Sequence, residues 1–321
     1  MDYTTLGKTG LRVSVAGLGC GGNSRLGLGA GKSVSEAAKV VRAAIDLGVN
    51  YFDTARNYGT EPVVGAAIKD VRRDSVVIST KSTVRVDGAR LTAERLIANL
   101  DNSLTQLGTD NIDVYMLHGV RPADYDYCLE TLAPALLKER DKGKFRHLGI
   151  TETAPRDPTQ QMLQRAVTEP CWEVVMLAYH MMNQGARMHV FPKTRENGVG
   201  TLLMFVVRNI FSKPGLLEGT VKDLVRNGDL PADLPDQDDP LGFLIHEGGA
   251  ASVIDAAYRF ARHQPGADVV LFGTGNPDHL QSNIDSILKP PLPDANVERL
   301  HALFGGLTGV GLDSPDNMPK P

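Results

Sequence analysis

The stretch FDTARNYG, residues 52–59, closes a short apolar run and opens a loop. Asp53 stands at the end of that run, and Tyr58 follows on the loop. The run itself, 49–52, is short and mainly apolar, which is typical of a strand buried on both faces. A buried strand followed by a loop and a helix is the unit that recurs along the rest of the chain.

Eight short apolar runs are each followed by sequence with helical spacing. The expected strands cover 15–18, 49–52, 76–80, 112–117, 147–150, 174–177, 201–207 and 269–272. The expected helices cover 33–47, 61–69, 92–107, 129–142, 159–167, 186–197, 252–263 and 277–288. Eight such units over about 250 residues predict an α/β protein with the (β/α)8 TIM barrel fold. A doubly wound open sheet uses the same alternation and is the alternative, but the count of eight favours the barrel.

Three segments lie outside these units. Residues 3–15 carry two glycines between short β-type segments and predict an N-terminal β-hairpin. Residues 228–249 are rich in Pro and Asp and lack periodicity, so we expect a long irregular loop that overhangs the C-terminal face of the barrel. The tail, 290–321, is expected to pack loosely across the barrel or to be partly disordered. We expect 1–321 to form a single domain.

The composition narrows the possible partners. The formal net charge is -4 and no basic run occurs, so neither nucleic acid nor an anionic membrane is an expected partner. No apolar stretch approaches the length of a membrane-spanning helix, and the N-terminus lacks the features of a secretory signal. The three cysteines are isolated and no metal-binding spacing occurs, so we expect a cytoplasmic protein without a metal site. A small molecule is the expected partner, and the sequence does not indicate an oligomeric state.

Ionisable residues stand at the ends of three consecutive expected strands. Asp53 ends the second strand, Lys81 the third and His118 the fourth, while Tyr58 lies on the loop after Asp53. In a (β/α)8 barrel these positions meet at one face. Each residue alone has an ordinary structural explanation, but a shared rim favours a joint catalytic role.

The four side chains suit proton transfer to a carbonyl oxygen. A tyrosine has a pKa near 10, and a nearby ammonium such as that of Lys81 is expected to lower it. Asp53 is expected to hold Lys81 by an ion pair, and His118 to donate a hydrogen bond to the carbonyl oxygen. Because no side chain supplies a hydride, this chemistry requires a redox cofactor.

The same residues resemble a known family. FDTARNYG at 52–59, STK at 79–81 and LH at 117–118 are similar to segments of the aldo-keto reductases, as are TGLRVSVAGLG at 9–19 and LFGTGNPDHLQSNI at 271–284. The resemblance implies an NAD(P)H-dependent oxidoreductase that interconverts a carbonyl (aldehyde, ketone or sugar) and an alcohol. It makes Tyr58 the general acid/base, Asp53 and Lys81 the residues that tune it, and His118 the group that positions the carbonyl. It also implies a nicotinamide dinucleotide bound in extended form.

The resemblance places the cofactor contacts along the same face. These are Gly19, Gly21, Asp53, Thr151, Glu152, Met176, Met204, Phe205, Arg208, Gly273, Thr274, Gly275, His279 and Asn283. Lys213 joins Arg208 as a candidate for the pyrophosphate. Several positions differ from the family pattern. Glu152 replaces an Asn and Met176 a Gln at the nicotinamide amide, and an ionised Glu152 accepts hydrogen bonds but cannot donate them.

Cofactor choice follows from the adenosine end of this set. Gly273 and His279 stand where many members of the family carry a Lys and an Arg for the 2′-phosphate. Backbone N–H groups of 274–276 remain available for an anion at the N-terminus of the last expected helix. NADP(H) is the expected cofactor, with NAD(H) as the alternative.

Two other functions use the same barrel. A Schiff-base lyase would employ Lys81 as the nucleophile, which requires an uncharged amine. A redox-sensing regulatory barrel would bind the cofactor with little turnover. The changed nicotinamide contacts keep this second alternative open.

Overall fold

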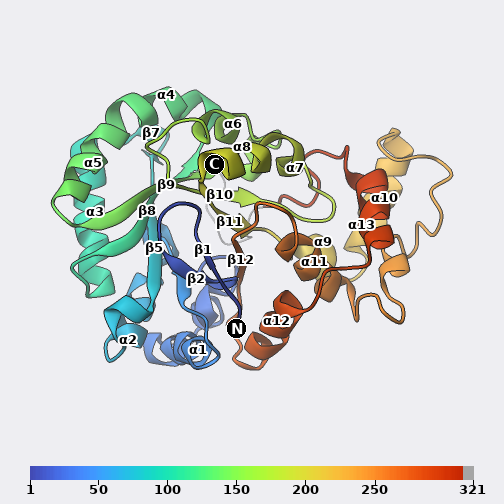
Figure 1. Ribbon diagram of the computed structural model, residues 1–321, viewed down its shortest axis with the longest axis horizontal. Helices are drawn as coiled ribbons and strands as arrows, with labels where there is room; N and C mark the ends of the chain where they lie inside the picture. Colours follow the sequence, from blue (N-terminus) through green and yellow to red (C-terminus); the bar gives the residue numbers. More distant parts are fainter. Residues whose placement is uncertain (314–321) are drawn as a thin grey trace.

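The computed structural model describes residues 1–313 and contains a closed barrel of eight parallel strands. Figure 1 shows the strands surrounded by helices, as the sequence predicted. The barrel strands are β3 (Ala16–Gly19), β4 (Tyr51–Asp53), β5 (Val77–Thr83), β8 (Ile112–Val120), β9 (Phe145–Glu152), β10 (Val174–Ala178), β11 (Gly200–Met204) and β12 (Val269–Phe272). Ring closure occurs between β12 and β3, which pair in parallel. The expected (β/α)8 fold is therefore confirmed, and the open-sheet alternative is excluded.

The helices of the barrel lie between or after its strands, and some of them have recognisable capping residues. They are α1 (Val34–Asp46), α2 (Glu61–Ile68), α3 (Ala93–Leu107), α4 (Tyr125–Tyr127), α5 (Ala133–Asp141), α6 (Gln161–Ala166), α7 (Ala186–His189), α8 (Phe191–Asn197), α11 (Val253–Arg262) and α12 (Asp278–Leu288). Ser33 caps α1 in a capping box with Glu36, and Gly108 ends α3 with a φ of 64°. These local signals explain why the helix positions were predictable.

The N-terminal hairpin closes one end of the barrel. Its strands are β1 (Tyr3–Thr5) and β2 (Arg12–Ser14). Leu6, Leu11 and Val13 are buried in one apolar cluster with residues of the barrel interior, among them Val114 and Val174. The hairpin lies across the barrel in the front of Figure 1. Since this end is filled, the polar groups at the opposite strand ends line the face that can admit a ligand.

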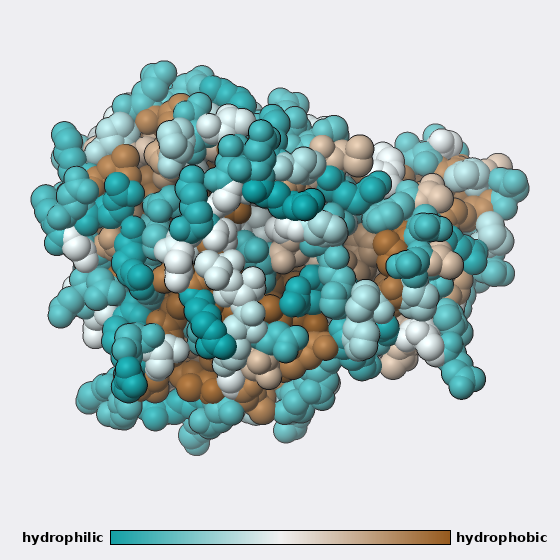
Figure 2. Space-filling model, viewed as in Figure 1, coloured by the Kyte–Doolittle hydropathy of each residue, from teal (hydrophilic) through white to brown (hydrophobic). Residues whose placement is uncertain are grey.

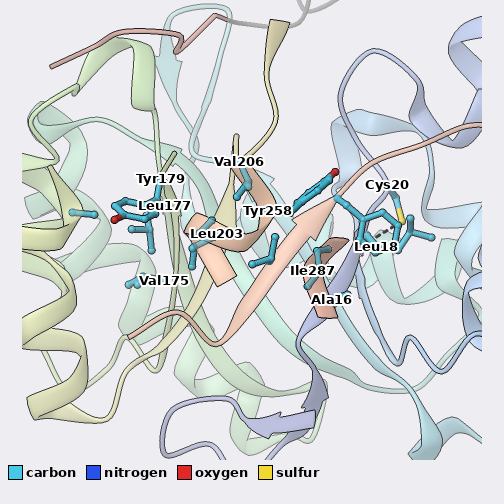
Figure 3. Close-up of a cluster of buried hydrophobic side chains, with 14 of the residues drawn as sticks. Ala16, Leu18, Cys20, Val175, Leu177, Tyr179, Leu203, Val206, Tyr258 and Ile287 are labelled. Carbon is cyan, nitrogen blue, oxygen red and sulfur yellow. Dashed lines mark hydrogen bonds between the residues drawn. The ribbon is translucent and has the colours of Figure 1, made fainter. Parts of the chain in front are cut away.

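A second apolar layer lies between the strands and the helices. Val175 and Leu177 alternate along β10 with Met176, so they face the helices while Met176 faces the barrel interior. Figure 3 shows Val175, Leu177 and Tyr179 together with Leu203 and other members of this layer. Two separate cores thus hold most strands, β4 and β5 among them, from both faces, which fixes the strand ends on which the site depends.

Residues 205–249 differ from the prediction. Strand β11 ends at Met204 rather than at Val207, because Phe205 has a φ of 66° that interrupts an extended strand. Two helices follow that we did not predict, α9 (Asn209–Ser212) and α10 (Leu216–Asn227). Leu217, Val221 and Leu224 recur at helical spacing, a pattern that predicts an amphipathic helix here.

The irregular loop 228–249 is held by contacts with helices late in the chain. Its only regular element is a 3-10 turn at Gly242–Leu244. Arg299 lies over the Phe243 ring at 4.1 Å, and Arg259 donates to the Gly249 carbonyl at 2.7 Å. Figure 1 shows this loop with α10 and α13 (Asp294–Phe304) at the right of the molecule. These contacts fix the loop against α11 and α13, and its position over the barrel mouth stays a prediction.

The tail is more ordered than we expected. Residues 294–304 form α13, in which Leu300 and Phe304 are fully buried. Loose packing or disorder is therefore wrong for the described part of the tail, and residues 314–321 lie outside the described residues. The surface in Figure 2 is largely hydrophilic. Among the described residues, no helix combines the length and apolar character needed to cross a membrane.

Removing the aromatic anchor of α13 tests this packing. Phe304→Ala should lower the free energy of unfolding by about 3–5 kcal/mol, because it leaves a cavity in a fully buried position. Glu298→Ala on the exposed side of the same helix is the control, with an expected change within about 0.5 kcal/mol. Denaturant titration of both variants measures the difference. Equal stability of the two variants would mean that α13 does not pack as described.

Candidate active site

The four predicted catalytic residues meet at the C-terminal end of the barrel. Strand register sets three of them side by side: Asp53 pairs with Ser79 on β5, and Thr83 of β5 pairs with His118 on β8. Lys81 lies between those two positions on β5. The fourth residue, Tyr58, closes a 3-10 turn (Arg56–Tyr58) directly after β4, and Gly59 ends this turn with a φ of 71°.

Lys81 and Asp53 form a buried ion pair. The ammonium donates to both carboxylate oxygens, at 2.6 and 2.7 Å, and to the Thr54 carbonyl at 2.8 Å. The side-chain hydroxyl of Ser79 also donates to Asp53, at 2.7 Å. Lys81 is fully buried, and these three contacts give each N–H of its ammonium a protein acceptor. The charged groups of this pair therefore have the hydrogen-bond partners that a buried ion pair needs to be stable.

Tyr58 lies between this ion pair and His118. Its hydroxyl is 3.3 Å from Nε2 of His118, and the Lys81 ammonium is 5.1 Å from the centre of its ring. Gly21 lies against the ring, since a Cβ at that position would stand 2.5 Å from Cε2 of Tyr58. The predicted cofactor residue Gly21 thus permits the approach of Tyr58 to the loop after β3.

The electrostatics of the site differ from our expectation for Tyr58. Burial, and next the charge of Asp53, raise the pKa of Tyr58 above its ordinary value. The predicted lowering by Lys81 does not occur, because Asp53 neutralises the ammonium at contact distance. Burial, and next the charge of Lys81, lower the pKa of His118 to about 3. At neutral pH the site therefore holds a protonated phenol beside a neutral imidazole.

A strand irregularity directs His118 toward the mouth. The register between β8 and β9 shifts between Leu117 and Val120, and Gly119 within this bulge has a φ of 64°. The Gly119 N–H donates to the Thr151 hydroxyl at 2.7 Å. Thr151, predicted as a cofactor contact, therefore also supports the backbone that carries His118.

Glu152 is the most unusual of the predicted cofactor residues. Its Oε1 accepts from the Ala178 N–H at 2.5 Å and from the Gln160 amide at 3.2 Å. Oε2 is buried and has no hydrogen-bond partner within residues 1–313. Burial raises the pKa of Glu152 to about 8, so the carboxyl group is mainly neutral at pH 7. A protonated Glu152 can donate as well as accept, which removes the limit that we assigned to it from the sequence.

Gln160 was missed by the sequence analysis, although it holds Glu152 in place. It is buried, and its backbone has a φ of 59°, a left-handed conformation that is strained for a residue with a side chain. Its side-chain amide donates to Glu152 and to the Ala178 carbonyl. Only the spatial proximity of β9, β10 and the start of α6 reveals this role.

Part of the predicted cofactor set contacts the tail. Met204 and Phe205 border a small apolar cluster at the strand ends, which contains Ala154, Ala178 and the tail residue Leu312. Arg208 forms an ion pair with Asp313 at 2.9 Å and lies over the Phe205 ring at 4.2 Å. The tail thus crosses the mouth, as we expected, but through specific contacts at β9, β10 and β11. Of the remaining predicted residues, Lys213 directly follows α9. Met176 faces the barrel interior.

The adenosine end of the predicted set lies on the loop after β12. Gly273, Thr274 and Gly275 lead from β12 toward α12, which carries His279 and Asn283. Gly275 lies against Gly27 of the first loop, and Lys32 of that loop donates to the Gly275 carbonyl at 2.7 Å. Gly19 ends β3 beside Asp53. The loops after the first and last barrel strands therefore form one surface.

Comparison with known proteins agrees with this arrangement. The family model described as Aldo/keto reductase family matches residues 17–304. The chain belongs to the aldo/keto reductase family. The resemblance read from the four-residue set is thereby confirmed. Proteins similar to this chain are named as reductases and dehydrogenases, so the family is one of oxidoreductases.

Its relatives span most of the chain. Aldo-keto reductase YhdN of Bacillus subtilis (strain 168) is 29% identical over 301 residues, which cover 88% of this chain and 87% of that protein. L-galactose dehydrogenase of Arabidopsis thaliana is 30% identical over 208 residues, 63% of this chain and 64% of that protein. The apo structure of aldo-keto reductase AKR11C1 from Bacillus halodurans has a TM-score of 0.73 at 22% identity, covering 98% of this chain and 100% of that chain. This last match supports the barrel fold.

The neutral state of Glu152 has a measurable consequence for stability. The unfolded chain ionises this residue near a pKa of about 4.3, whereas the folded protein does so near 8. Between these values the folded state binds more protons, so the wild type loses stability as pH rises through this window. Glu152→Gln removes the titrating group and should gain stability relative to wild type from pH 5 to pH 8, on the order of 3 kcal/mol.

Denaturant titrations of both proteins at several pH values measure this difference. Other titrating groups cancel in the comparison, because both proteins carry them. A difference in unfolding free energy that does not change with pH would show that Glu152 is already ionised in the folded protein.

Proposed function

We propose that this protein is an NAD(P)H-dependent oxidoreductase that interconverts a carbonyl group and an alcohol, with Tyr58 as the general acid/base. One observation carries the proposal: Tyr58 lies in contact with a neutral His118 and beside the fully buried Lys81–Asp53 pair. Family membership supports the reaction type. The substrate class is an aldehyde, a ketone or a sugar.

The chain's own residues handle the proton. Because the pKa of Tyr58 is raised, its hydroxyl holds a proton at neutral pH and can donate it to a carbonyl oxygen. The phenolate that results lies near the Lys81 ammonium, which stabilises the new negative charge. His118, neutral and with its ring near the same hydroxyl, can donate from Nε2 to the carbonyl oxygen and orient it. In the oxidative direction Tyr58 accepts the proton instead.

The residues at the mouth fit a nicotinamide dinucleotide. When bound, this cofactor supplies or accepts the hydride. The buried and unpartnered Oε2 of Glu152 suits the carboxamide of a nicotinamide, together with Thr151. Met176, Met204 and Phe205 offer apolar surface, and Arg208 a cation for the pyrophosphate. The loop carrying Gly273, Thr274 and Gly275 is assigned to the adenosine end, together with His279 and Asn283 of α12. Gly19 and Gly21 are assigned to the cofactor near the catalytic centre.

NADP(H) is the cofactor that we favour. The expected Lys and Arg for a 2′-phosphate are absent, but Lys32 brings an ammonium to the Gly275 carbonyl from another loop. Backbone N–H groups before α12 add further donors for an anion. NAD(H) remains the alternative.

The geometry disfavours the Schiff-base lyase. A nucleophilic lysine must be neutral, whereas the Lys81 ammonium donates to Asp53 twice and to the Thr54 carbonyl. Deprotonation would leave the buried Asp53 without its counter-ion, which is costly. The redox-sensing alternative shares the cofactor site and differs in turnover, which the next experiment measures.

Tyr58→Phe tests the assigned role directly. The variant should lose about 10²–10⁴-fold in kcat for carbonyl reduction, because the proton donor is removed. Its dissociation constant for NADPH, measured by fluorescence titration, should stay within about twofold of wild type because the ring is retained. Turnover within a few-fold of wild type would contradict the role of Tyr58. Turnover that is very slow in the wild type itself would favour a sensor.

Cofactor preference has its own test. The wild type should show a higher kcat/KM with NADPH than with NADH, and Lys32→Met should reduce this ratio because it removes the ammonium near Gly275. Lys39→Met on helix α1 is the control. A tenfold preference of the wild type for NADH would overturn the choice of NADP(H).

A further inference from the structure

Four arginines gather on the loops beyond the strands that carry Lys81 and His118. Arg85 and Arg90 belong to a small hairpin after β5, formed by β6 (Arg85–Val86) and β7 (Ala89–Arg90). Arg121 follows β8 directly, and Arg156 lies in the turn after β9. We call these four residues the arginine rim.

Strand register places the rim next to the catalytic residues. Thr83 pairs with His118, and Arg85 lies two residues beyond Thr83. Val120 pairs with Glu152, and Arg121 directly follows Val120. Arg121 lies three positions after His118, which corresponds to about 10 Å of extended chain. The rim therefore borders the same side of the mouth as His118 and Glu152.

Arg85 and Arg90 share a single carboxylate. Both guanidinium groups donate to Oδ1 of Asp124, at 2.7 and 2.8 Å, and Asp124 is buried. The two arginine side chains remain 33% and 43% exposed. Asp87 in the turn of the hairpin adds a second carboxylate, so Arg85 and Arg90 are balanced by Asp87 and Asp124. Any uncompensated positive charge at this side of the mouth must therefore come from Arg121 and Arg156.

Arg121 and Arg156 pair with no carboxylate in the described part of the chain, residues 1–313. Neither side chain makes a hydrogen bond or an ion pair within residues 1–313. Asp157, the neighbour of Arg156 in sequence, caps α6 instead. Its carboxylate accepts hydrogen bonds from the N–H groups of Gln161 and Met162. The pKa of Arg156 is lowered by burial and next by the charge of Arg121, as expected of two guanidinium groups close together.

This positive charge is not a consequence of composition. The whole chain has a formal net charge of -4, so acidic residues outnumber basic ones. Arg121 and Arg156, which pair with no carboxylate within residues 1–313, are therefore a local concentration of positive charge beside the balanced hairpin. Guanidinium groups bind carboxylate and phosphate oxygens through paired hydrogen bonds, which an ammonium does not match.

We propose that the arginine rim binds an oxyanion on the substrate, so that this protein acts on carbonyl compounds that carry a carboxylate or phosphate group. This inference rests on the proposed carbonyl reduction at Tyr58. Arg121 and Arg156, which have no other side-chain partners within residues 1–313, bind the anion, and Arg85 and Arg90 border them. The separation of the rim from His118 suits a short substrate, with a few carbon atoms between the carbonyl group and the anion.

Matched substrates test the charge preference. We would compare kcat/KM for butanal with that for 4-oxobutanoate, and for glyceraldehyde with that for glyceraldehyde 3-phosphate. The anionic member of at least one pair should be favoured by about tenfold or more, which corresponds to about 1.4 kcal/mol. The two pairs distinguish a carboxylate from a phosphate. A preference for both neutral members would overturn the inference.

Arg121→Gln and Arg156→Gln test the residues. Each variant should lose about tenfold or more in kcat/KM for the favoured anionic substrate and stay within about threefold of wild type for its neutral partner. Arg95→Gln, on the exposed side of α3, is the matched control and should change neither value. Equal losses on both members of a pair would overturn the assignment of the rim.

Binding without turnover separates this inference from the proposed function. Succinate, which is not reduced, should bind the full chain in calorimetry, and Arg121→Gln should weaken it by about tenfold. If no aldehyde is reduced while succinate binds in this way, the carbonyl reduction fails and the anion site stands. If neutral aldehydes are reduced but succinate does not bind, the arginine rim fails and the reduction stands.

Discussion

The buried ion pair between Lys81 and Asp53 is the interaction on which the site depends. Two charges within a barrel are costly to desolvate, so they persist only where each is matched by partners. Here both carboxylate oxygens, the Thr54 carbonyl and the Ser79 hydroxyl supply those partners. The arrangement requires neighbouring strands in fixed register, which the two apolar layers around these strands provide.

This pairing also decides the electrostatics of Tyr58. A free ammonium beside a phenol would favour the phenolate, but an ammonium already paired with Asp53 does so weakly. Burial then raises the pKa of Tyr58, and the phenol holds its proton. Catalysis through this group would use the charge of Lys81 when the phenolate forms, rather than before the reaction. The neutral His118 completes a site that is poised to donate protons.

Residues from several loops form the walls of the mouth around this centre. Glu152 is held by Gln160 as a neutral acid at a position where the family pattern has an amide. Leu312 and Asp313 of the tail contact the ends of the strands on one side. The arginine rim lies on the side of β5, β8 and β9. In the proposed function, these four residues carry the chemistry and the loops around them select the ligand.

The sequence by itself determined the order of eight strands and helices and the four residues at their ends, because periodicity, capping and strand-end position are local properties of the chain. It did not reveal α13, the role of Gln160 or the contacts of loop 228–249, since each depends on residues distant in sequence. It also misjudged the pKa of Tyr58. That value depends on burial and on which partner the Lys81 ammonium meets, and only the tertiary structure decides both.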